Sequence, residues 1–427
     1  MAIRTNFLKN GITCFITATT FFITPIVYGQ VLGCTDPLSN NYNALATVND
    51  GSCTYNTANY SPPVKLDPLS DSVIETSGLQ FVNNFLWTFN DSGGQPELYK
   101  TDTNSNTLLQ RVYLGGAVNI DWEDIAFDGT YFYVGDFGNN ANGARADLKI
   151  YRFPYSAIHD AATHPIDTIP AGMIQKINFS YSDQPLPLQA VAANFTKFDC
   201  EAMIVDGGKI HLFTKNWVNF VTTHYVINGV TAGTYTALPV ETLATNFLVT
   251  AADKAPGKKL VALLGYQNSG TANHFLYLLS DYNSGLYFNG SKRNVNLQDV
   301  FYMGQAEGIT FSSSNYGYIT NEKFIKYIGS NPIITVTSKL HSFATDQLIS
   351  ALASTYQFIG NGNWDIAGNW INNLLPPAVL PFNSEIFIDP LAAGQCILNV
   401  PYSLSTGCSI IVNKNVSMII EGGLTVQ

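Results

Sequence analysis

Charged side chains are scarce in this sequence. Only 12% of its 427 residues are Asp, Glu, Lys or Arg, and the formal net charge is -10. The 21 Lys and Arg residues are dispersed and form no basic stripe, so nucleic acid is not an expected partner. The G-x-S-x-G, H-E-x-x-H, Walker and strand-bound G-x-G-x-x-G motifs are also missing, and the enzyme classes that they mark are not indicated.

Long apolar runs are confined to the N-terminus. Arg4 and Lys9 precede an apolar stretch over residues 12–26, which Val27, Tyr28 and Gly29 follow. This order is typical of a signal peptide, and we expect cleavage after Gly29. No later run is long enough to cross a bilayer, so we expect a secreted, extracellular or cell-surface protein, exported in a Gram-negative context, with no transmembrane segment after cleavage.

Cysteines are few as well. There are six, and Cys14 leaves with the predicted signal peptide. The export context permits disulfides, and we predict that Cys34 pairs with Cys53 and that Cys396 pairs with Cys408. Cys200 then remains odd. Because no histidine stands near it in its motif, we expect a buried, small apolar residue and no nucleophile.

The residues that are abundant indicate an all-β protein of several domains. Hydrophobic residues make up 46% of the chain and aromatic residues 13%, in short Val/Ile/Tyr/Phe runs bounded by turn residues. The length exceeds one ordinary core. We divide the chain into a signal peptide (1–29), a small Cys-bounded module (30–56), a linker (57–63), a β-propeller (64–348) and a β-rich module (349–427) that the sequence ends within.

Repeated strand starts predict the propeller. Glu123, Glu201 and Glu307 each begin an apolar strand, and Ser77 takes the same place in a fourth, with Glu75 two residues earlier on the same strand face. Radial repetition of four-stranded blades brings such starts to one central channel.

Counting these starts gives five blades, beginning at 77, 123, 201, near 252 and 307. The 78-residue interval from 123 to 201 leaves six blades as the alternative. In the fourth blade Ala252 stands in the glutamate frame and Asp253 aligns with Asp124, which interrupts the ring of acids. We expect residues 64–66 to close the ring by pairing with residues 339–344.

Carboxylates that share a channel must protonate, pair with a cation or bind a metal, and Ca²⁺ is the metal that a carboxylate-rich mouth suits. The predicted metal ligands are Glu75, Glu123, Glu201 and Glu307. The predicted ligand-binding residues are Glu75, Ser77, Asn90, Asp91, Asp121, Asp124, Asp253 and Lys215. The structural alternative is that these acids accept hydrogen bonds from neighbouring blades and cap turns. No catalytic residue is assigned.

The propeller segment resembles an uncharacterised family of secreted bacterial β-propellers. The matching residues are Asn90–Gly93 (NDSG), Gly116–Ala126 (GAVNIDWEDIA), Cys200–Met203 (CEAM) and Glu307–Ile309 (EGI). The Glu75-x-Ser77-Gly78 and Glu307-Gly308-Ile309 starts are similar to those of gluconolactonase-type and esterase-like phytase propellers. This second resemblance implies Ca²⁺ in the channel.

The two flanking modules also resemble known units. Residues 34–55 follow the pattern CxDPxxxNYNxxAxxxDGSCxY, found in bacterial secreted and surface proteins. So short a unit needs a disulfide and turns from Asp36, Asn41, Asn43 and Asp50. Residues 360–427 resemble GNWxxxxNW modules of bacterial surface proteins, and their evenly spaced short β-runs predict a solenoid or a small sandwich.

Taken together, these features predict an exported ligand-binding or interaction protein. Its acidic channel would hold Ca²⁺ and bind a small molecule or glycan, and we expect a monomer. Two alternatives stay open. One is a metal-dependent ester, lactone or phosphoester hydrolase, which needs an open coordination position beside an acid or base, and the other is a structural or adhesive surface protein.

Overall fold

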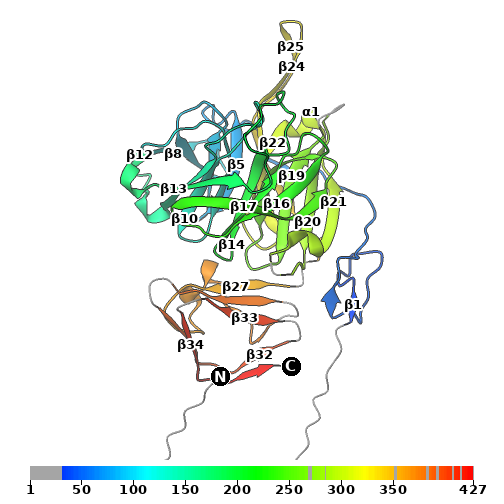
Figure 1. Cartoon of the computed structure of the whole chain (residues 1–427), viewed down its shortest axis with the longest axis vertical. Helices are drawn as coiled ribbons and strands as arrows, with labels where there is room; N and C mark the ends of the chain where they lie inside the picture. The colour runs from blue at the N-terminus through cyan, green and yellow to red at the C-terminus, as the bar shows by residue number, and fades with distance from the viewer. Residues whose placement is uncertain are drawn as a thin grey trace, which may run out of the picture. The chain divides into compact units, whose positions relative to one another are not determined.

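The chain folds almost entirely into β-strands, joined by short turns (Figure 1). The computed structural model describes residues 31–267, 272–283, 285–350, 353–380, 384–390, 394–405, 408–413 and 416–426. The predicted signal peptide (1–29) lies outside these residues. No helix in the described part of the chain is long and apolar enough to span a membrane.

The small N-terminal module contains two short parallel strands, β1 (Leu32–Gly33) and β2 (Val48–Asn49). The predicted disulfide is confirmed, because Cys34 and Cys53 are bonded with a Cα–Cα distance of 4.8 Å. Asp36, Asn43 and Asp50 accept hydrogen bonds from the backbone N–H two residues on, as the turn interpretation requires.

The central segment is β-propeller-like: its sheets are mainly antiparallel, and their inner strands contact one another in a closed series. The first sheet holds β5 (Thr76–Val82), β6 (Phe85–Asn90), β7 (Glu97–Thr101) and β8 (Leu108–Leu114), with β12 (Ile166–Ile169) added parallel to β8. The next two are β9 (Trp122–Phe127), β10 (Tyr131–Asp136), β11 (Lys149–Pro154) and β13 (Gln175–Tyr181), then β14 (Cys200–Asp206), β15 (Lys209–Thr214), β16 (Val221–Ile227) and β17 (Gly233–Ala244). Their outer strands β13 and β17 pair in parallel and join them into one sheet.

Each of the two remaining sheets contains late strands of the segment and one short strand from its beginning. One contains β18 (Leu248–Lys254), β19 (Leu260–Tyr266), β20 (His274–Ser280), β21 (Ser291–Asn296) and β3 (Ala58–Asn59). The other contains β22 (Gln305–Phe311), β23 (Tyr316–Glu322), β26 (Lys339–Ala344) and β4 (Val64–Leu66). The predicted closure of the ring by residues 64–66 is confirmed, since β4 pairs with β26. Residues 58–59 contribute a strand where a plain linker was expected.

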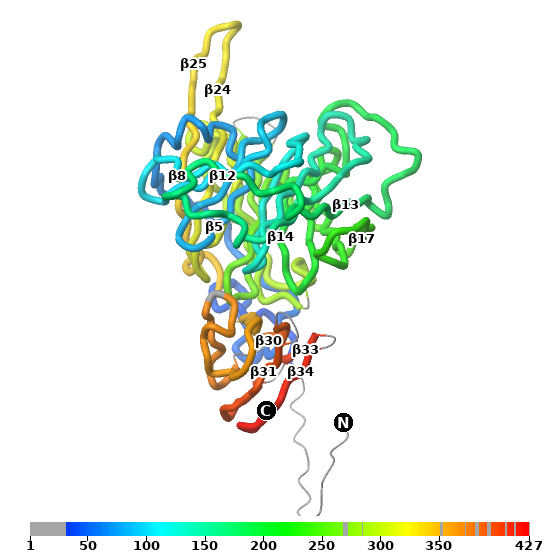
Figure 2. Tube along the Cα trace, turned by 90° about the vertical axis from the view of Figure 1, so that its left-hand side faces the viewer, coloured from blue at the N-terminus to red at the C-terminus, as the bar shows by residue number. Residues whose placement is uncertain are grey.

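Two elements lie outside this repeat and had no counterpart in the sequence analysis. A hairpin of β24 (Phe324–Ile328) and β25 (Asn331–Val336) extends away from the ring sheets in both views (Figure 1 and Figure 2). The short helix α1 (Val300–Met303) precedes β22, capped by Asp299. Short 3-10 turns occupy Tyr155–Ala157, Ala171–Met173, Tyr287–Asn289, Ala367–Asn369 and Ile371–Asn373.

The inner strands β5, β9, β14, β18 and β22 pack side by side in that order, and β22 returns to β5. Side chains link each neighbour to the next. Asp124 on β9 accepts hydrogen bonds from the Met203 N–H (2.7 Å) and the Ile125 N–H (2.8 Å). Asp253 on β18 does the same for the Phe311 N–H (2.7 Å), and Thr310 accepts from the Phe81 N–H (3.0 Å), which closes the ring. Apolar clusters fill the spaces between the sheets.

The C-terminal module is a β-solenoid. Successive coils stack three parallel sheets: β27 (Thr355–Phe358), β30 (Glu385–Ile388) and β33 (Ser409–Val412); β28 (Gly362–Asn363), β31 (Gln395–Leu398) and β34 (Ser417–Ile420); β29 (Val379–Leu380), β32 (Tyr402–Leu404) and β35 (Leu424–Val426). The sandwich alternative is wrong, because every pairing is parallel and in register with the next coil.

The predicted Cys396–Cys408 disulfide is also wrong. Cys396 is a buried, free cysteine on β31, whereas Cys408 precedes β33 in a different sheet of the solenoid. The Cys408 thiol donates to the Leu380 carbonyl at 3.7 Å. Two cysteines that are close in the sequence of a solenoid can therefore lie on different faces of the coil, where no disulfide can join them.

Removing the Asp124 carboxylate tests the ring. We expect Asp124→Ala to lower the free energy of unfolding by about 2–4 kcal/mol, because two buried N–H groups lose their acceptor. Asp124→Asn keeps one acceptor oxygen and should lower the free energy of unfolding by less. Urea unfolding measures both, with Asp71→Ala, at an exposed position, as a control that stays within about 0.5 kcal/mol. A fully stable Asp124→Ala protein would contradict the assignment.

Candidate functional site

A β-bulge recurs near the start of each inner strand and places the predicted glutamates. The pairing register skips one residue at Gly78, Glu123, Glu201, Thr250 and Glu307. Bulges re-aim a side chain and interrupt pairing, which is why they accompany binding sites. In the fourth inner strand, β18, the bulged residue is Thr250. The prediction that Ala252 takes the place of the glutamate in this strand is therefore wrong by two residues.

Two further positions repeat around the same mouth. Asp121, Asp199 and Gln305 stand two residues before the bulged glutamates and share their strand face. The ends of the second strands contribute Asp91, Lys215, Tyr266 and Glu322. The register supports this grouping, because the Lys215 N–H donates to the Asp199 carbonyl and Glu322 pairs with Gln305.

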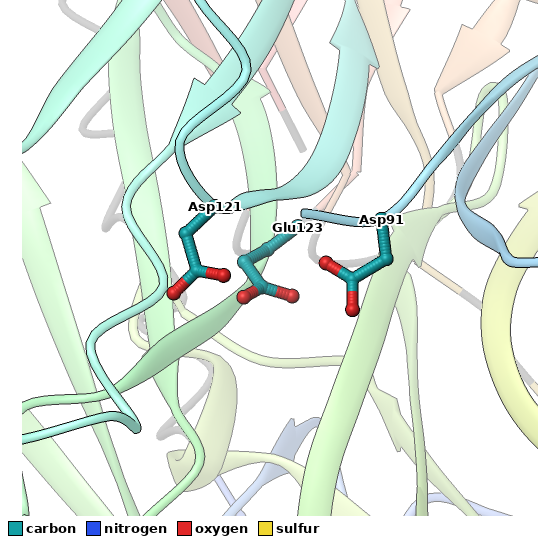
Figure 3. Close-up of side chains that lie close together, drawn as sticks. All are labelled: Asp91, Asp121 and Glu123. Atoms are coloured by element: carbon teal, nitrogen blue, oxygen red, sulfur yellow. The ribbon is translucent and has the colours of Figure 1, made fainter. Parts of the chain in front are cut away.

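Asp91, Asp121 and Glu123 form a cluster in which one carboxylate oxygen of each lies within 4.8 Å of the others. Figure 3 shows the three carboxylates turned toward a shared space. Asp91 and Asp121 are partly exposed, whereas Glu123 is 3% exposed. Gly138 borders this space, since a Cβ there would lie 1.9 Å from Glu123 Oε1 and 2.5 Å from Asp121 Oδ2. The glycine keeps room beside the acids.

Burial and mutual repulsion raise the pKa of all three groups. Desolvation and the nearby Glu307 raise the pKa of Asp91 to about 7. Desolvation and Asp199 raise the pKa of Asp121 to about 6. For Glu123, burial is the largest cause, followed by Glu201, Asp91 and Asp121, and its pKa lies well above the ordinary value. Within the described part of the chain, no hydrogen-bond donor contacts the Glu123 carboxylate.

Lys215 neutralises the other side of the channel. Its Nζ lies 2.8 Å from Glu201 Oε2 and 3.8 Å from Glu307 Oε1, and all three side chains are almost fully buried. Burial alone lowers the pKa of a lysine, but Glu201, Tyr266 and Glu307 raise that of Lys215 well above its ordinary value. Gln305 Nε2 donates to Glu307 Oε1 at 2.7 Å. Glu201 and Glu307 therefore have a cation or a donor beside them, unlike Glu123, although burial still raises the pKa of Glu201 well above its ordinary value.

Glu322 adds an acid at the rim. Burial, Glu307 and Asp91 raise its pKa well above the ordinary value of a glutamate. A raised pKa favours the protonated carboxyl, which can donate a hydrogen bond, over the ionised form, which can only accept.

Several predicted site residues lie elsewhere or have other roles. Glu75 is exposed. Its backbone N–H donates a hydrogen bond to Asn90 Oδ1, and its carbonyl accepts one from the Asp91 N–H. The Ser77 hydroxyl donates to the Glu123 carbonyl, and Asn90 Nδ2 donates to the Ser72 carbonyl. Asp124 and Asp253 are the links between inner strands described above. These five residues fit the structural alternative.

Of the predicted metal ligands, only Glu123 belongs to the acidic cluster; its partners Asp91 and Asp121 were predicted as ligand-binding residues. Sequence reasoning missed Asp199, Glu322, Tyr266, Gln305 and Gly138. A signal for some of them exists, because Asp-x-Glu at 121–123 and 199–201 and Gln-x-Glu at 305–307 repeat in one frame. Glu322 and Tyr266 carry no such pattern.

The cysteine and histidines near the channel strands are not set up for catalysis. Burial raises the pKa of the Cys200 thiol, which is fully buried, as its sequence context predicted. His211 and His224 are buried, joined at 2.8 Å, and His224 contacts Glu241. Burial and His224 lower the pKa of His211 to about 3. Both imidazoles are therefore neutral, packed groups.

No protein-family model and no curated protein matches the chain. Among solved structures it is similar to the PQQ-bound aldose sugar dehydrogenase from Streptomyces coelicolor, with 9% identity, a TM-score of 0.33, and 66% of this chain and 100% of that chain covered. It is also similar to a bifunctional GH43-CE protein from Bacteroides eggerthii, with 12% identity, a TM-score of 0.32 and coverage of 68% and 38%. It is also similar to a chain of a mitotic checkpoint complex, with 10% identity, a TM-score of 0.27, and 66% of this chain and 85% of that chain covered. At these values the similarities carry no functional argument.

The raised pKa values predict how stability depends on pH. The folded, metal-free protein holds protons on Asp91 and Asp121 up to about pH 7 and 6, whereas the unfolded chain releases them near the ordinary aspartate pKa of 3.8. The stability that these groups contribute is therefore full below about pH 4 and is lost as the pH rises to about 7.

We expect the free energy of unfolding in EDTA to fall between about pH 5 and pH 7, measured by urea unfolding. Asp91→Asn and Asp121→Asn should each flatten that fall. A wild-type profile that rises over this range would contradict the raised pKa values.

Proposed function

We propose that residues 64–348 form a five-bladed β-propeller that binds a divalent cation, Ca²⁺, at its channel mouth, and through it a polar ligand. Asp91, Asp121 and Glu123 would be the protein ligands of the ion. The inner-strand ring β5–β9–β14–β18–β22 supports the blade number.

The observation that carries this proposal is the state of Glu123. Its carboxylate is almost fully buried, contacts no hydrogen-bond donor in the described residues, and faces two other acids. A buried ionised group without a partner is costly, so such a group either keeps a proton or has a cation beside it. A divalent cation would compensate all three acids at once.

Calcium suits this donor set better than softer metals. The cluster offers only oxygen atoms, which hard cations prefer, and two of the three residues are partly exposed. Ca²⁺ takes six to eight oxygen ligands, so several positions would stay available for water or ligand hydroxyls. Gly138 makes room for the Glu123 and Asp121 carboxylates that would hold the ion.

Binding is favoured over hydrolysis by the state of the neighbouring groups. Cys200 is a buried thiol, and the buried His211–His224 pair is neutral. A hydrolase of esters, lactones or phosphoesters stays the second candidate on one observation, the raised pKa of Glu322 near Asp91, because an acid that holds its proton to higher pH could protonate a leaving group.

We further propose that the protein is exported and works outside the cell or on its surface. The Cys34–Cys53 disulfide supports this, since disulfides persist in oxidising compartments. The solenoid and the small disulfide module would then act as spacers or attachment units.

Calcium titration tests the cation site. We expect Ca²⁺ to raise the melting temperature of EDTA-treated protein, because an ion that binds only the folded state stabilises it by about 2.7 kcal/mol at one hundred times its Kd. Asp121→Asn should weaken binding at least about tenfold, measured by calorimetry, whereas Asp71→Asn should not change it. An unchanged wild-type melting temperature would rule the site out.

A single methyl group at residue 138 provides a sharper test. Gly138→Ala would push the Glu123 and Asp121 carboxylates aside, and we expect Ca²⁺ affinity to fall by about tenfold or more. Gly172→Ala is the matched control, since nothing lies within 4 Å of its added Cβ. Equal Ca²⁺ affinity in the two variants would argue against the cluster as the ion's position.

A further inference from the structure

The β24–β25 hairpin exposes apolar side chains that nothing in the described chain covers. The two strands pair only with each other among the described strands, and Tyr327, Ile328 and Ile333 are 54%, 67% and 47% exposed. A lone two-stranded hairpin is marginally stable in water. Exposed apolar side chains on such an element mark a binding surface.

A groove of about 520 Å³ lies at the base of this hairpin. Its volume falls within the range of about 300–1,000 Å³ that small-ligand sites occupy. The residues used in the argument below are Tyr266, Phe301, Gln305, Phe324, Ile325 and Tyr327.

The groove continues to the acids of the channel. Gln305 lines the groove and donates to Glu307 Oε1 at 2.7 Å. Tyr266 also lines it, and the Lys215 ammonium lies 5.4 Å from the centre of its ring. Glu322 ends the strand that leads directly into the hairpin. A ligand in the groove would therefore reach a row of hydrogen-bonding groups at one end.

We propose that this groove binds a neutral oligosaccharide, whose sugar rings stack on the aromatic side chains while hydroxyls at one end reach the channel mouth. The inference rests on the proposed cation-binding function and names the ligand class of that site. Phe301, Phe324 and Tyr327 line the groove; Phe301 and Phe324 pack edge to face with ring centres 6.5 Å apart, and Tyr327 is 54% exposed, so a sugar's axial C–H groups meet aromatic surface there.

The charges and hydrogen-bonding groups select a neutral, hydroxyl-rich ligand. Acids outnumber cations at the mouth, which disfavours an anionic chain, and the Lys326 ammonium, 5.4 Å from the Phe301 ring centre, disfavours a polycation in the groove. Hydroxyls both donate and accept. Glu201 and Glu307 offer acceptor oxygens, Lys215 and Gln305 offer N–H donors, and a bound Ca²⁺ can coordinate neighbouring hydroxyls.

Calorimetric titration of the full chain with oligosaccharides tests the inference. The probes are cellohexaose, mannohexaose and chitohexaose, with hexagalacturonate as the anionic and hexalysine as the cationic comparison. We expect at least one neutral hexasaccharide to bind, and Tyr327→Ala to weaken that binding by about 3- to 10-fold through lost stacking. Tyr42→Ala, 47% exposed in the N-terminal module, is the matched control and should leave affinity unchanged.

Calcium binding is measured in the same samples, so the two proposals can fail separately. Tyr327→Ala should keep the Ca²⁺-induced rise in melting temperature, whereas Asp121→Asn should lose it. If Ca²⁺ stabilises the protein but none of the neutral probes binds, the oligosaccharide inference is overturned and the cation site stands. Binding of hexagalacturonate or hexalysine alone would also overturn it. If a neutral probe binds without any Ca²⁺ effect, the groove assignment stands and the cation site is rejected.

Discussion

Hydrogen bonds between neighbouring inner strands are the constraint on which the rest of this structure depends. Side chains join neighbouring sheets: Asp124 accepts from the Met203 N–H, Thr250 donates to the Ala306 carbonyl, and Lys254 pairs with Asp206. These links hold the bulged strand starts at one mouth. Without them, acids more than two hundred residues apart in the sequence would not meet.

The same ring creates an electrostatic imbalance. Glu201 and Glu307 lie within ion-pair distance of Lys215, whereas within the described residues no ion pair is made by Asp91, Asp121 or Glu123. Burial and neighbouring acids raise the pKa of Asp91 and that of Asp121, and they outweigh Lys215, which lowers the pKa of Asp91, and Arg145 and Lys215, which lower that of Asp121. Burial also raises the pKa of Glu123 and of Glu201. The site is thus defined by where Lys215 and Arg145 lie as much as by where the acids lie.

The strand pattern of the first sheet could be predicted closely. The strands β6, β7 and β8 are short runs of mostly apolar residues bounded by turn residues, which are local features that a sequence displays directly. The strands β17 and β21 and the hairpin β24–β25 were missed. The strands β17, β24 and β25 are exposed over much of their length, so no alternation of buried residues marks them in the sequence. β17 is held by pairing with β13 and β16, and β24 and β25 pair with each other.

The site was predicted in outline and not in detail. Repeated glutamates pointed to a channel and included Glu123, but two proposed acids, Asp124 and Asp253, join the inner strands instead. Which oxygens share a space depends on the bulge register, and a shift of one residue moves a side chain to the other face of a strand.

By itself the sequence determined the strand-rich class, the disulfide module and the repeat that brings acids together, because turn propensity, cysteine spacing and periodicity act over short distances. Only the tertiary structure decided which acids Lys215 pairs with, that Gly138 lies against Glu123, and that the β24–β25 hairpin lines a groove together with Tyr266 and Gln305. Those features arise from contacts between segments far apart in the chain, whose geometry no local pattern records.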